Sequence, residues 1–472
     1  MSGPASLLEL EDDFARHLEL LNLPPKRWMP EAPEGVLDVA IVGAGLCGLA
    51  AHFALALDGI DNVRLFDAAP VGQEGPWVTY ARMETLRTAK EAAGPAMGIP
   101  SLTFRAWFEA QWGRAAWDDM NLAPREMWMD YLLWYRRMTG AKVVNDCAVR
   151  EITPEPAGFL LRTDSGTVRA RRVVLATGLD ALGAPFLPRA ARGLPEGRVL
   201  HSADRFDPSD FAGKRVVVVG AGASAMDNAA AALEAGCARL DLLVRRPAVP
   251  RVDKFTGTGS RGMTAGFVGL SDEDKWNLMS EAESWPVPPP RHSVERVARH
   301  KNAHLHVGAA IERVEARSDG LHLTTPVGEL EADVAIFATG FGIDLSRRPE
   351  LAAFARYVRT WGDVVGEAKA ARHPALAAHP YLAEDFTFTE RVPGQCPALS
   401  RIALFAYPSV PTHGKVTSGI PAATEGARRL SSGLVRSFFA EDAQYHLDRF
   451  RAYDTPDMTG EEWRASPMPV RA

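Results

Sequence analysis

Apolar residues near the start of the chain form a strand, a glycine turn and a helix in direct succession. The apolar run Val36–Val42 predicts a buried strand, which leads into a turn at 43–48 that reads Gly-Ala-Gly-Leu-Cys-Gly. The run Leu49–Leu57 then predicts a helix, and Asn62–Phe66 predicts a second strand that ends at Asp67. This order of strand, glycine turn, helix, strand and terminal acid is typical of a dinucleotide-binding unit.

The same pattern returns in the middle of the chain, with a different end. Its strand, glycine turn, helix and second strand are expected at Arg215–Val219, 220–225, Ala225–Ala235 and Arg239–Val244. Here the second strand ends in Arg245 and Arg246 rather than in an acid. The chain therefore carries two units of one kind that differ in the charge at the strand end.

Each unit is followed by an apolar strand that ends in Ala-Thr-Gly, at Val173–Gly178 and at Val334–Gly340. The simplest interpretation is two nucleotide-binding domains, with the second inserted into the first. The predicted fold class is therefore α/β, with two Rossmann-like dinucleotide-binding domains.

The N-terminal segment has the spacing of an amphipathic helix. Leu7, Leu10, Phe14, Leu18 and Leu21 recur every three to four residues, which predicts a helix that lies on the body of the protein. Several prolines between residues 24 and 33 separate this helix from the first strand.

Tryptophans concentrate between the first unit and the first Ala-Thr-Gly strand. Five of the eleven stand there among other aromatic residues, at Trp107, Trp112, Trp117, Trp128 and Trp134. We expect most of them to pack a helical cap at about residues 100–140, or a subunit contact. The alternative is that one or two line a pocket over a flat cofactor.

Composition excludes several classes of protein. Of the 472 residues, 46% are hydrophobic and 24% are charged, which is ordinary for a globular chain and excludes disorder and collagen. A formal net charge of −6 makes nucleic acid and anionic membranes poor partners. The most apolar stretch, Val39–Leu57, is too short and too interrupted by glycine to span a membrane.

The four cysteines lie far apart in the sequence, at Cys47, Cys147, Cys237 and Cys396. None is within five residues of another, so the chain has neither a disulfide framework nor the spacing of a zinc site. This usage fits a reducing compartment, and we expect a cytoplasmic protein without a metal site.

The first glycine turn has the spacing that a pyrophosphate needs. Gly43 permits the tight turn, Gly45 lets the backbone approach the phosphates, and Gly48 lets the helix pack closely on the strand. The helix N-terminus offers free N–H groups and a partial positive charge. Asp67 lies at about the distance expected for a carboxylate that accepts ribose hydroxyls. These residues predict a site for the adenosine half of FAD.

The second turn predicts a different cofactor. It keeps the motif at Gly220, Gly222, Ser224 and Ala225, since alanine is allowed at the third place. Arg245 and Arg246 stand where an acid would repel a 2′-phosphate, and a guanidinium pairs with phosphate bidentately. Such a bond contributes about 1.5–3 kcal/mol, a roughly ten- to hundredfold preference for NADPH over NADH. The alternative is that these arginines form a solvated turn.

Two dinucleotide sites in one chain point to electron transfer from NADPH to a flavin. A reduced flavin can pass electrons to a disulfide, a carrier protein or oxygen. Cys47 stands alone inside the first turn, which removes the disulfide and leaves a carrier or oxygen.

A further helix is expected from about Ala422, after a segment that contains proline and glycine. We infer that its start, with Ser418 and Ile420, points at the flavin ring, where its partial positive charge would stabilise the reduced anionic flavin. A helix that only closes the domain is an equally compatible interpretation.

Taken together, the motifs resemble the class B flavoprotein monooxygenases, which include flavin-containing, N-hydroxylating and Baeyer–Villiger monooxygenases. The resemblance covers roughly residues 36–430. The run 75–77, Gly-Pro-Trp, resembles the family's Gly-Gly-x-Trp flavin contact, and the run 197–202, Gly-Arg-Val-Leu-His-Ser, resembles its fingerprint. The second Ala-Thr-Gly signature is also present. The residues singled out by this resemblance are Trp77, Thr88, His201, Thr339 and Gly340.

Departures from the family pattern bear on the reaction. Pro195 replaces the Phe that opens the fingerprint, and Arg205 stands where the Baeyer–Villiger version has Trp, which favours oxygenation of a heteroatom. The family's Thr-Asn pair near the flavin is represented by Thr88 without the Asn. Arg87 or Lys90 then becomes the candidate for holding the peroxyflavin, unless both are ordinary surface charges.

The mechanism implied by the resemblance uses FAD, NADPH and O2. NADPH reduces FAD, NADP⁺ stays bound, and a C4a-(hydro)peroxyflavin transfers one oxygen atom to a nitrogen or sulfur atom of a small molecule. The protein has to exclude water from this site. His201 is expected at the domain junction rather than in proton transfer. The oligomeric state is open, with a homodimer as one option.

Three alternatives stay open at this point. They are Baeyer–Villiger oxidation of a ketone, a FAD/NADPH reductase that passes electrons to a carrier, and a non-catalytic nucleotide-sensing flavoprotein. The expected boundaries are an N-terminal helix and linker at 1–35, the first part of the FAD domain at 36–200, the NADPH domain at 201–330, the second part of the FAD domain at 331–440, and a tail at 441–472.

Overall fold

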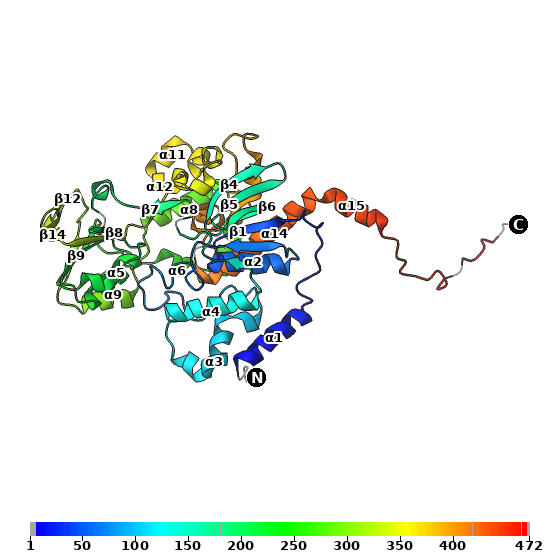
Figure 1. The fold of residues 1–472 in the computed structure, drawn as a ribbon, viewed down its shortest axis with the longest axis horizontal. Coiled ribbons are helices and arrows are strands. Elements are labelled where there is room, and N and C mark those ends of the chain that lie inside the picture. The colour runs from blue at the N-terminus through cyan, green and yellow to red at the C-terminus, as the bar shows by residue number, and fades with distance from the viewer. Residues whose placement is uncertain (1–5, 180, 196, 418, 464, 470–472) are drawn as a thin grey trace.

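A computed structural model describes residues 6–179, 181–195, 197–417, 419–463 and 465–469. Figure 1 shows two sheet-containing bodies side by side, a helical layer below them, and a C-terminal segment that extends away from the rest. The prediction of an α/β fold with two Rossmann-like domains is confirmed.

The first domain is built on a sheet in which the described residues form seven strands. The order is β3-β2-β1-β6-β5-β4, with β17 paired to β6; β3, β2, β1, β6 and β17 run parallel. The bounds are β1 Val36–Val42, β2 Val63–Phe66, β3 Val143–Val144, β4 Val149–Glu155, β5 Gly158–Thr163, β6 Gly166–Leu175 and β17 Ile402–Leu404. Almost every residue of β1 is buried because helices and loops cover both faces, as parallel sheets require.

The second domain has a parallel sheet of five strands among the described residues, in the order β11-β10-β9-β15-β8. The bounds are β8 Val199–His201, β9 Arg215–Val219, β10 Arg239–Val244, β11 Ala303–Val307 and β15 Val334–Phe337. All of these strands fall between β6 and β17 in the sequence, so the second sheet is inserted into the first domain.

Two predicted boundaries have to move. The first part of the first domain was expected to extend to residue 200, but β8 pairs with β15 and lies in the inserted sheet. The second part of the first domain was expected to begin at residue 331, but β15 pairs with β9, Val334 opposite Val216, and so belongs to the inserted sheet. This pairing places the Ala-Thr-Gly end of β15 against the glycine turn that follows β9. The strand is therefore part of the inserted domain.

The chain crosses between the two domains twice, and the crossings pair with each other. β7, Gly183–Pro185, and β16, Phe341–Ile343, form an antiparallel pair. A Cβ on Gly183 would lie 1.8 Å from the carbonyl oxygen of Gly342, so the two linkers approach as closely as backbones can. The inserted domain also carries an antiparallel sheet of β12 Arg313–Arg317, β13 Gly320–Thr325 and β14 Gly328–Ala332.

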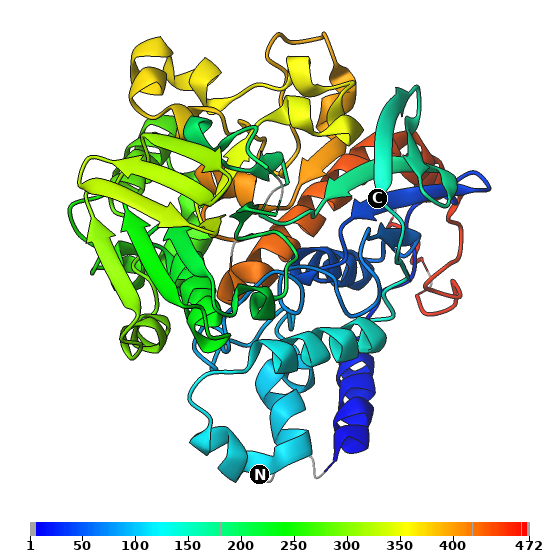
Figure 2. The same cartoon turned by 60° about the vertical axis from the view of Figure 1, so that its left-hand side comes forward.

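Helices α2, Leu46–Leu57, and α14, Ala423–Glu441, pack on each other in the first domain, and α14 starts one residue after the predicted position. In Figure 2 the orange-red α14 runs through the middle of the molecule, between the green inserted domain and the blue first domain. In the inserted domain α5, Ala223–Glu234, packs on α9, Arg291–Ala298. Among the described residues, the other helices between α5 and α14 are α6 Lys254–Thr258, α7 Arg261–Gly266, α8 Asp272–Ser284, α10 Trp361–Val365, α11 Glu367–Arg372, α12 Pro374–Ala377 and α13 Val410–His413.

The aromatic-rich cap forms the helical layer at the bottom of Figure 2, with α3, Phe104–Asp119, and α4, Arg125–Met138. The N-terminal helix α1, Leu7–Leu20, packs against it and buries Leu10 and Phe14, as its periodicity predicts. Four of the five tryptophans are buried in the core, whereas Trp112 is 46% exposed. The interpretation of these residues as core packing therefore holds for most of them.

The segment expected as a tail contains one more helix, α15, Ala443–Ala452, which buries none of its residues. From α15 the chain extends away from the domains (Figure 1). Among the described residues, we find no helix with the length and apolar character needed to cross a membrane.

Candidate functional site

The first glycine turn has a shape that only glycine permits. Gly43 has φ +101°, and a Cβ there would lie 2.4 Å from the carbonyl oxygen of Ala176, in the first Ala-Thr-Gly. A Cβ on Gly48 would lie 1.9 Å from the Gly43 oxygen. At Gly45, by contrast, a Cβ would meet only Gly75 Cα, at 4.0 Å, and no side chain caps the start of α2. The first N–H groups of α2 are therefore available to a phosphate.

Asp67 ties this turn to the end of β2. Its Oδ2 accepts a hydrogen bond from the Ala44 N–H at 2.7 Å, and its Oδ1 accepts one from the Ala69 N–H at 2.8 Å. Burial raises the pKa of Asp67, and these two backbone bonds oppose that rise. Because each carboxylate oxygen has two lone pairs, the side chain can hold the turn and still accept ribose hydroxyls.

The second glycine turn repeats this construction. Gly220 has φ +145°, and its Cβ would lie 2.6 Å from the carbonyl oxygen of Ala338, in the second Ala-Thr-Gly. Gly222 precedes α5, where no side chain caps the helix and a Cβ would meet nothing within 4 Å. Ala225 is fully buried and Ser224 is exposed on the first turn of α5. Both turns therefore fit a dinucleotide pyrophosphate.

Arg245 and Arg246 follow the last residue of β10, which is the place that Asp67 holds after β2. Arg245 is exposed and Arg246 is half-buried. Within the described part of the chain, neither guanidinium makes a hydrogen bond or an ion pair. Both are therefore available to a ligand bound at the second turn.

His201 lies at the end of β8, at the junction of the domains. Its Nδ1 accepts from the Ala203 N–H at 3.1 Å, so the proton is on Nε2, which donates to the Gly340 carbonyl at 3.0 Å. Burial lowers the pKa of His201. Both ring nitrogens are thus occupied: Nδ1 holds the backbone after β8, and Nε2 holds the second Ala-Thr-Gly at Gly340. The neighbouring Thr339 hydroxyl donates to the Phe186 carbonyl, on the other linker.

Lys90 has a different place from the one that the sequence suggested. Its Nζ donates to the carbonyls of Trp117, Asp118 and Met120, at 2.6, 3.3 and 2.5 Å. These carbonyls lie at the end of α3, which leaves its last carbonyls without helical partners. Lys90 caps this helix, so we do not retain it as a group that acts on the reacting oxygen.

Arg87 points to the inserted domain. Its Nη2 lies 4.0 Å from Oδ2 of Asp227, a buried residue of α5 that also accepts a bond from the Ser293 hydroxyl at 2.6 Å. Nearby, Glu84 lies 3.7 Å from Arg296 of α9, and Arg82 donates to the Phe206 carbonyl at 3.0 Å. The segment 82–87 of the first domain thus contacts the inserted domain at three points.

The segment before α14 lies between the two domains. The Thr417 carbonyl accepts a weak bond from Cys47 Sγ at 3.4 Å, on the first glycine turn. Lys415 lies 3.5 Å over the ring of Phe255, in the inserted domain. Ile420 is buried, and Ser418 lies outside the described residues. Burial raises the pKa of Cys47 to about 12, which keeps its thiol protonated.

Trp77 and Thr88 are both half-buried. Trp77 packs edge-to-face on Trp128, with ring centroids 6.2 Å apart, and its carbonyl accepts a bond from Arg125 at 3.0 Å. The buried aromatic cap therefore supports Trp77 at the position where the sequence predicts a flavin contact.

A cavity of about 630 Å³ lies where the two domains meet, and we call it the α7–α14 cavity. Its lining comes from the segment 93–103, from α7 of the inserted domain and from the first turns of α14. The Thr424 hydroxyl donates to the Gly94 carbonyl at 3.2 Å, and Arg429 donates to the Thr264 carbonyl at 3.2 Å, which join these walls. Sequence patterns could not indicate this cavity because three distant segments form it.

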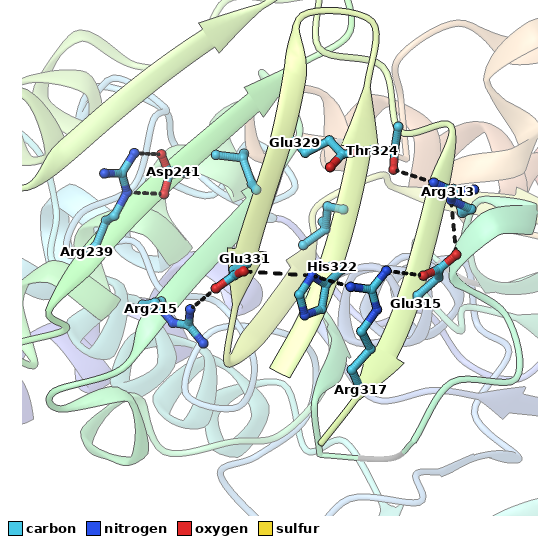
Figure 3. A pocket seen from close by; sticks show the side chains of 12 residues that line it. Arg215, Arg239, Asp241, Arg313, Glu315, Arg317, His322, Thr324, Glu329 and Glu331 are labelled. Atoms are coloured by element: carbon cyan, nitrogen blue, oxygen red, sulfur yellow. Dashed lines mark hydrogen bonds and ion pairs between the residues drawn. The ribbon is translucent and has the colours of Figure 1, made fainter. Parts of the chain in front are cut away.

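A second hollow, of about 460 Å³, lies on the inserted domain over β13 and β14 (Figure 3). Its charges pair with one another: Arg215 lies 2.8 Å from Glu331, and Arg239 lies 2.7 Å from Asp241. His322 with Asp319 and Glu331 has the composition of a metal-binding group, with ligand atoms within 4.8 Å. Because Glu331 already pairs with Arg215, we regard this surface as a network of ion pairs.

Comparison with known proteins places the chain in a family. Residues 40–254 match the pyridine nucleotide-disulphide oxidoreductase family. The FAD-dependent urate hydroxylase of Xanthomonas campestris pv. campestris is 37% identical over 474 residues, which cover 99% of this chain and 99% of that protein. L-lysine N6-monooxygenase of Escherichia coli is 24% identical over 246 residues, 47% of this chain and 57% of that protein.

Solved structures agree on the fold. Ornithine hydroxylase from Pseudomonas aeruginosa superposes with a TM-score of 0.65 at 18% identity, covering 85% of this chain and 99% of the other. The ornithine N-hydroxylase of Kutzneria sp. 744, a complex with reduced FAD, NADP⁺ and L-ornithine, gives 0.66 at 17% identity, with the same coverage. The chain uses FAD and belongs to the class B flavin-dependent monooxygenases, in the family of the FAD-dependent urate hydroxylase.

Proposed function

We propose that this monooxygenase hydroxylates urate, or a closely related oxopurine, with NADPH as the electron donor. The observation that carries the proposal is the 37% identity to a urate hydroxylase over 99% of both chains. The match extends through both glycine turns, the aromatic cap and the lining of the α7–α14 cavity. Because the similarity covers the whole length of both proteins, it includes the residues of the candidate site as well as those that determine the fold. We therefore infer a shared substrate class.

In this proposal the first glycine turn holds FAD and the second holds NADPH. Gly43, Gly45, Gly48 and Asp67 bind the adenosine and pyrophosphate of FAD. Gly220, Gly222, Ser224 and Ala225 form the corresponding NADPH site. FAD held by the first turn would supply the redox chemistry that links NADPH to O2.

The remaining predicted residues position these parts. We assign Trp77, Thr88 and Ile420 to contacts with the flavin. His201 and Thr339 hold the two linkers together, and we assign them positioning roles. In the same way, Arg87 is assigned to the contact between the domains, since it faces Asp227 at 4.0 Å.

The protein's task is to keep water from the reacting centre until the substrate is bound. The inserted domain contributes to this by covering the segment before α14, where Phe267 approaches the position of a Gly414 Cβ to 3.0 Å. The overall reaction consumes one NADPH, one proton and one O2, places one oxygen atom on the substrate and releases the other as water.

Oxygenation of an amine nitrogen is the second candidate. It is favoured by the similarity to L-lysine N6-monooxygenase over 47% of this chain. Against it stands the charge of the α7–α14 cavity, whose ionisable lining is two arginines and one glutamate. A surplus of positive charge suits an anionic substrate better than an ammonium group.

A substrate panel separates these candidates. We expect urate to accelerate NADPH oxidation by the purified holoenzyme without a matching rise in hydrogen peroxide. Lysine and ornithine, a thioether and a cyclic ketone represent the nitrogen, sulfur and Baeyer–Villiger reactions. Two results together would favour oxygenation of an amine nitrogen over urate hydroxylation. They are NADPH oxidation that urate does not change and that yields only hydrogen peroxide, and an oxygenated product from lysine or ornithine.

A further inference from the structure

The ionisable lining of the α7–α14 cavity comes from both domains. Arg261 is the first residue of α7, in the inserted domain, whereas Glu425 and Arg428 lie on α14. Among the described lining residues these three are the ionisable ones, with a net charge of one positive unit. A single anionic ligand would therefore neutralise the cavity.

The two guanidinium groups have hydrogen-bonding capacity left. Arg428 donates from Nη2 to the Met97 carbonyl at 2.7 Å, which uses one of its five N–H bonds and fixes the side chain. Arg261 makes no side-chain hydrogen bond or ion pair within the part of the chain that the structure describes. Glu425 lies 3.7 Å from Arg429, a loose contact that leaves its oxygens able to accept from a ligand.

One wall of the cavity consists of small residues, among them Gly94, Ala96 and Gly98. A Cβ on Gly98 would lie 3.2 Å from Nη2 of Arg428, and one on Gly94 would lie 3.0 Å from the Tyr131 hydroxyl. Both glycines also have positive φ, so larger residues are strained there. The small residues on this wall leave room beside the Arg428 guanidinium, which a side chain at Gly98 would occupy.

We propose that Arg261 and Arg428 bind the anionic edge of urate and that Glu425 accepts a hydrogen bond from one of its ring N–H groups. This assignment rests on the proposed function and names the residues that give it specificity. Urate is a planar monoanion at neutral pH, with carbonyl oxygens and N–H groups along its edges. Guanidinium groups match such an edge in geometry as well as in charge. A cationic amine would meet two positive charges in the same place.

The proposed anion site is divided between the two domains. Because Arg261 belongs to the inserted domain, the anion site is complete only when α7 lies against α14. The contact from Arg429 to the Thr264 carbonyl, at 3.2 Å, holds this arrangement. Substrate specificity is thus coupled to the placement of the domain that is expected to bring NADPH.

The test compares three glutamine variants of the holoenzyme: Arg261→Gln, Arg428→Gln and the matched control Arg436→Gln. Arg436 is exposed on the same helix, outside the cavity lining. We expect the KM for urate to rise about tenfold in each cavity variant, the loss of one charge-assisted bond, while kcat changes less. Arg428→Lys, which keeps the charge, should recover part of the loss. Flavin content reports whether each variant folds, and Arg261, which like Arg428 is exposed, provides a second, independent variant.

The outcomes separate the site from the proposed function. If the wild-type enzyme oxygenates urate but both cavity variants keep its KM, the arginine site is wrong and the proposed function stands. Titration of the oxidised holoenzyme with urate, followed by flavin fluorescence, gives a readout that does not depend on turnover. A wild-type enzyme that neither binds nor oxygenates urate overturns the proposed function and the site with it.

Discussion

At the scale of single residues, the two nucleotide turns differ mainly in the residue that follows the second strand. Asp67 bonds to the backbone of its own turn, whereas the guanidinium groups of Arg245 and Arg246 make no hydrogen bond or ion pair in the described part of the chain. A side chain without a partner is open to a ligand, and a guanidinium recognises a phosphate. We therefore place the discrimination between NADPH and NADH at these two arginines.

Replacing both arginines, Arg245→Ala with Arg246→Ala, should raise the KM for NADPH about ten- to hundredfold and change that for NADH much less. The reason is the loss of a charge-assisted bond to the 2′-phosphate, which is worth about 1.5–3 kcal/mol. Steady-state kinetics with both nucleotides measure this, with Arg16→Ala on the exposed face of α1 as the control. Equal effects on the KM values for the two nucleotides would indicate that the arginines form a solvated turn and do not bind the 2′-phosphate.

At the scale of elements, the segment 82–87 connects the two domains by pairs of opposite charge. Glu84 of the first domain faces Arg296, and Arg87 faces Asp227, at 3.7 and 4.0 Å. Each pair joins one exposed and one buried side chain at a separation longer than a hydrogen bond, so it contributes little stability, but the alternation of sign favours one arrangement of the domains. We attribute to this contact the placement of NADPH relative to the flavin.

Arg87→Glu places a like charge against the buried Asp227 and should slow the reduction of the flavin by NADPH about tenfold or more. Arg87→Lys keeps the sign and should retain most of the rate. Stopped-flow absorbance of the flavin measures the reduction, and the affinity for FAD shows whether the first domain is intact. A glutamate variant that is reduced as fast as the wild type would contradict a role in domain placement.

Local patterns predicted the elements that follow from local physics. The strands at 36–42 and 215–219 and both glycine turns could be predicted because apolar runs and glycine spacing encode them within about ten residues. The role of Lys90 could not, since it depends on where α3 ends relative to a loop some thirty residues earlier. The α7–α14 cavity is harder still, because it brings together residues near 94, 261 and 428.

At the scale of the whole molecule, two buried histidines make stability depend on pH. His52 lies in α2 and His413 in α13, 7% and 0% exposed. Burial lowers the pKa of His52 to about 4 and that of His413 to about 3. Both rings are therefore neutral in the folded protein at pH values where an unfolded chain, with a histidine pKa of about 6.5, would be protonated.

The free energy of unfolding should accordingly fall as the pH drops below about 6.5, because the two histidines then bind protons in the unfolded state but not in the folded state. Each histidine contributes about 1.4 kcal/mol per pH unit in this range, down to its folded pKa. Urea unfolding of the holoenzyme between pH 8 and pH 5 measures the slope. His413→Gln should flatten the acid limb relative to the wild type, and an unchanged slope would assign the acid sensitivity to other groups.

The central claim, that this chain is a monooxygenase that acts on urate, is tested most directly by isotope incorporation. The holoenzyme turns over urate and NADPH under ¹⁸O2, and the product is quenched within seconds and analysed by mass spectrometry. We predict one ¹⁸O atom in each product molecule and one NADPH consumed for each. A product that carries only solvent oxygen, or NADPH consumption matched entirely by hydrogen peroxide, would contradict the claim.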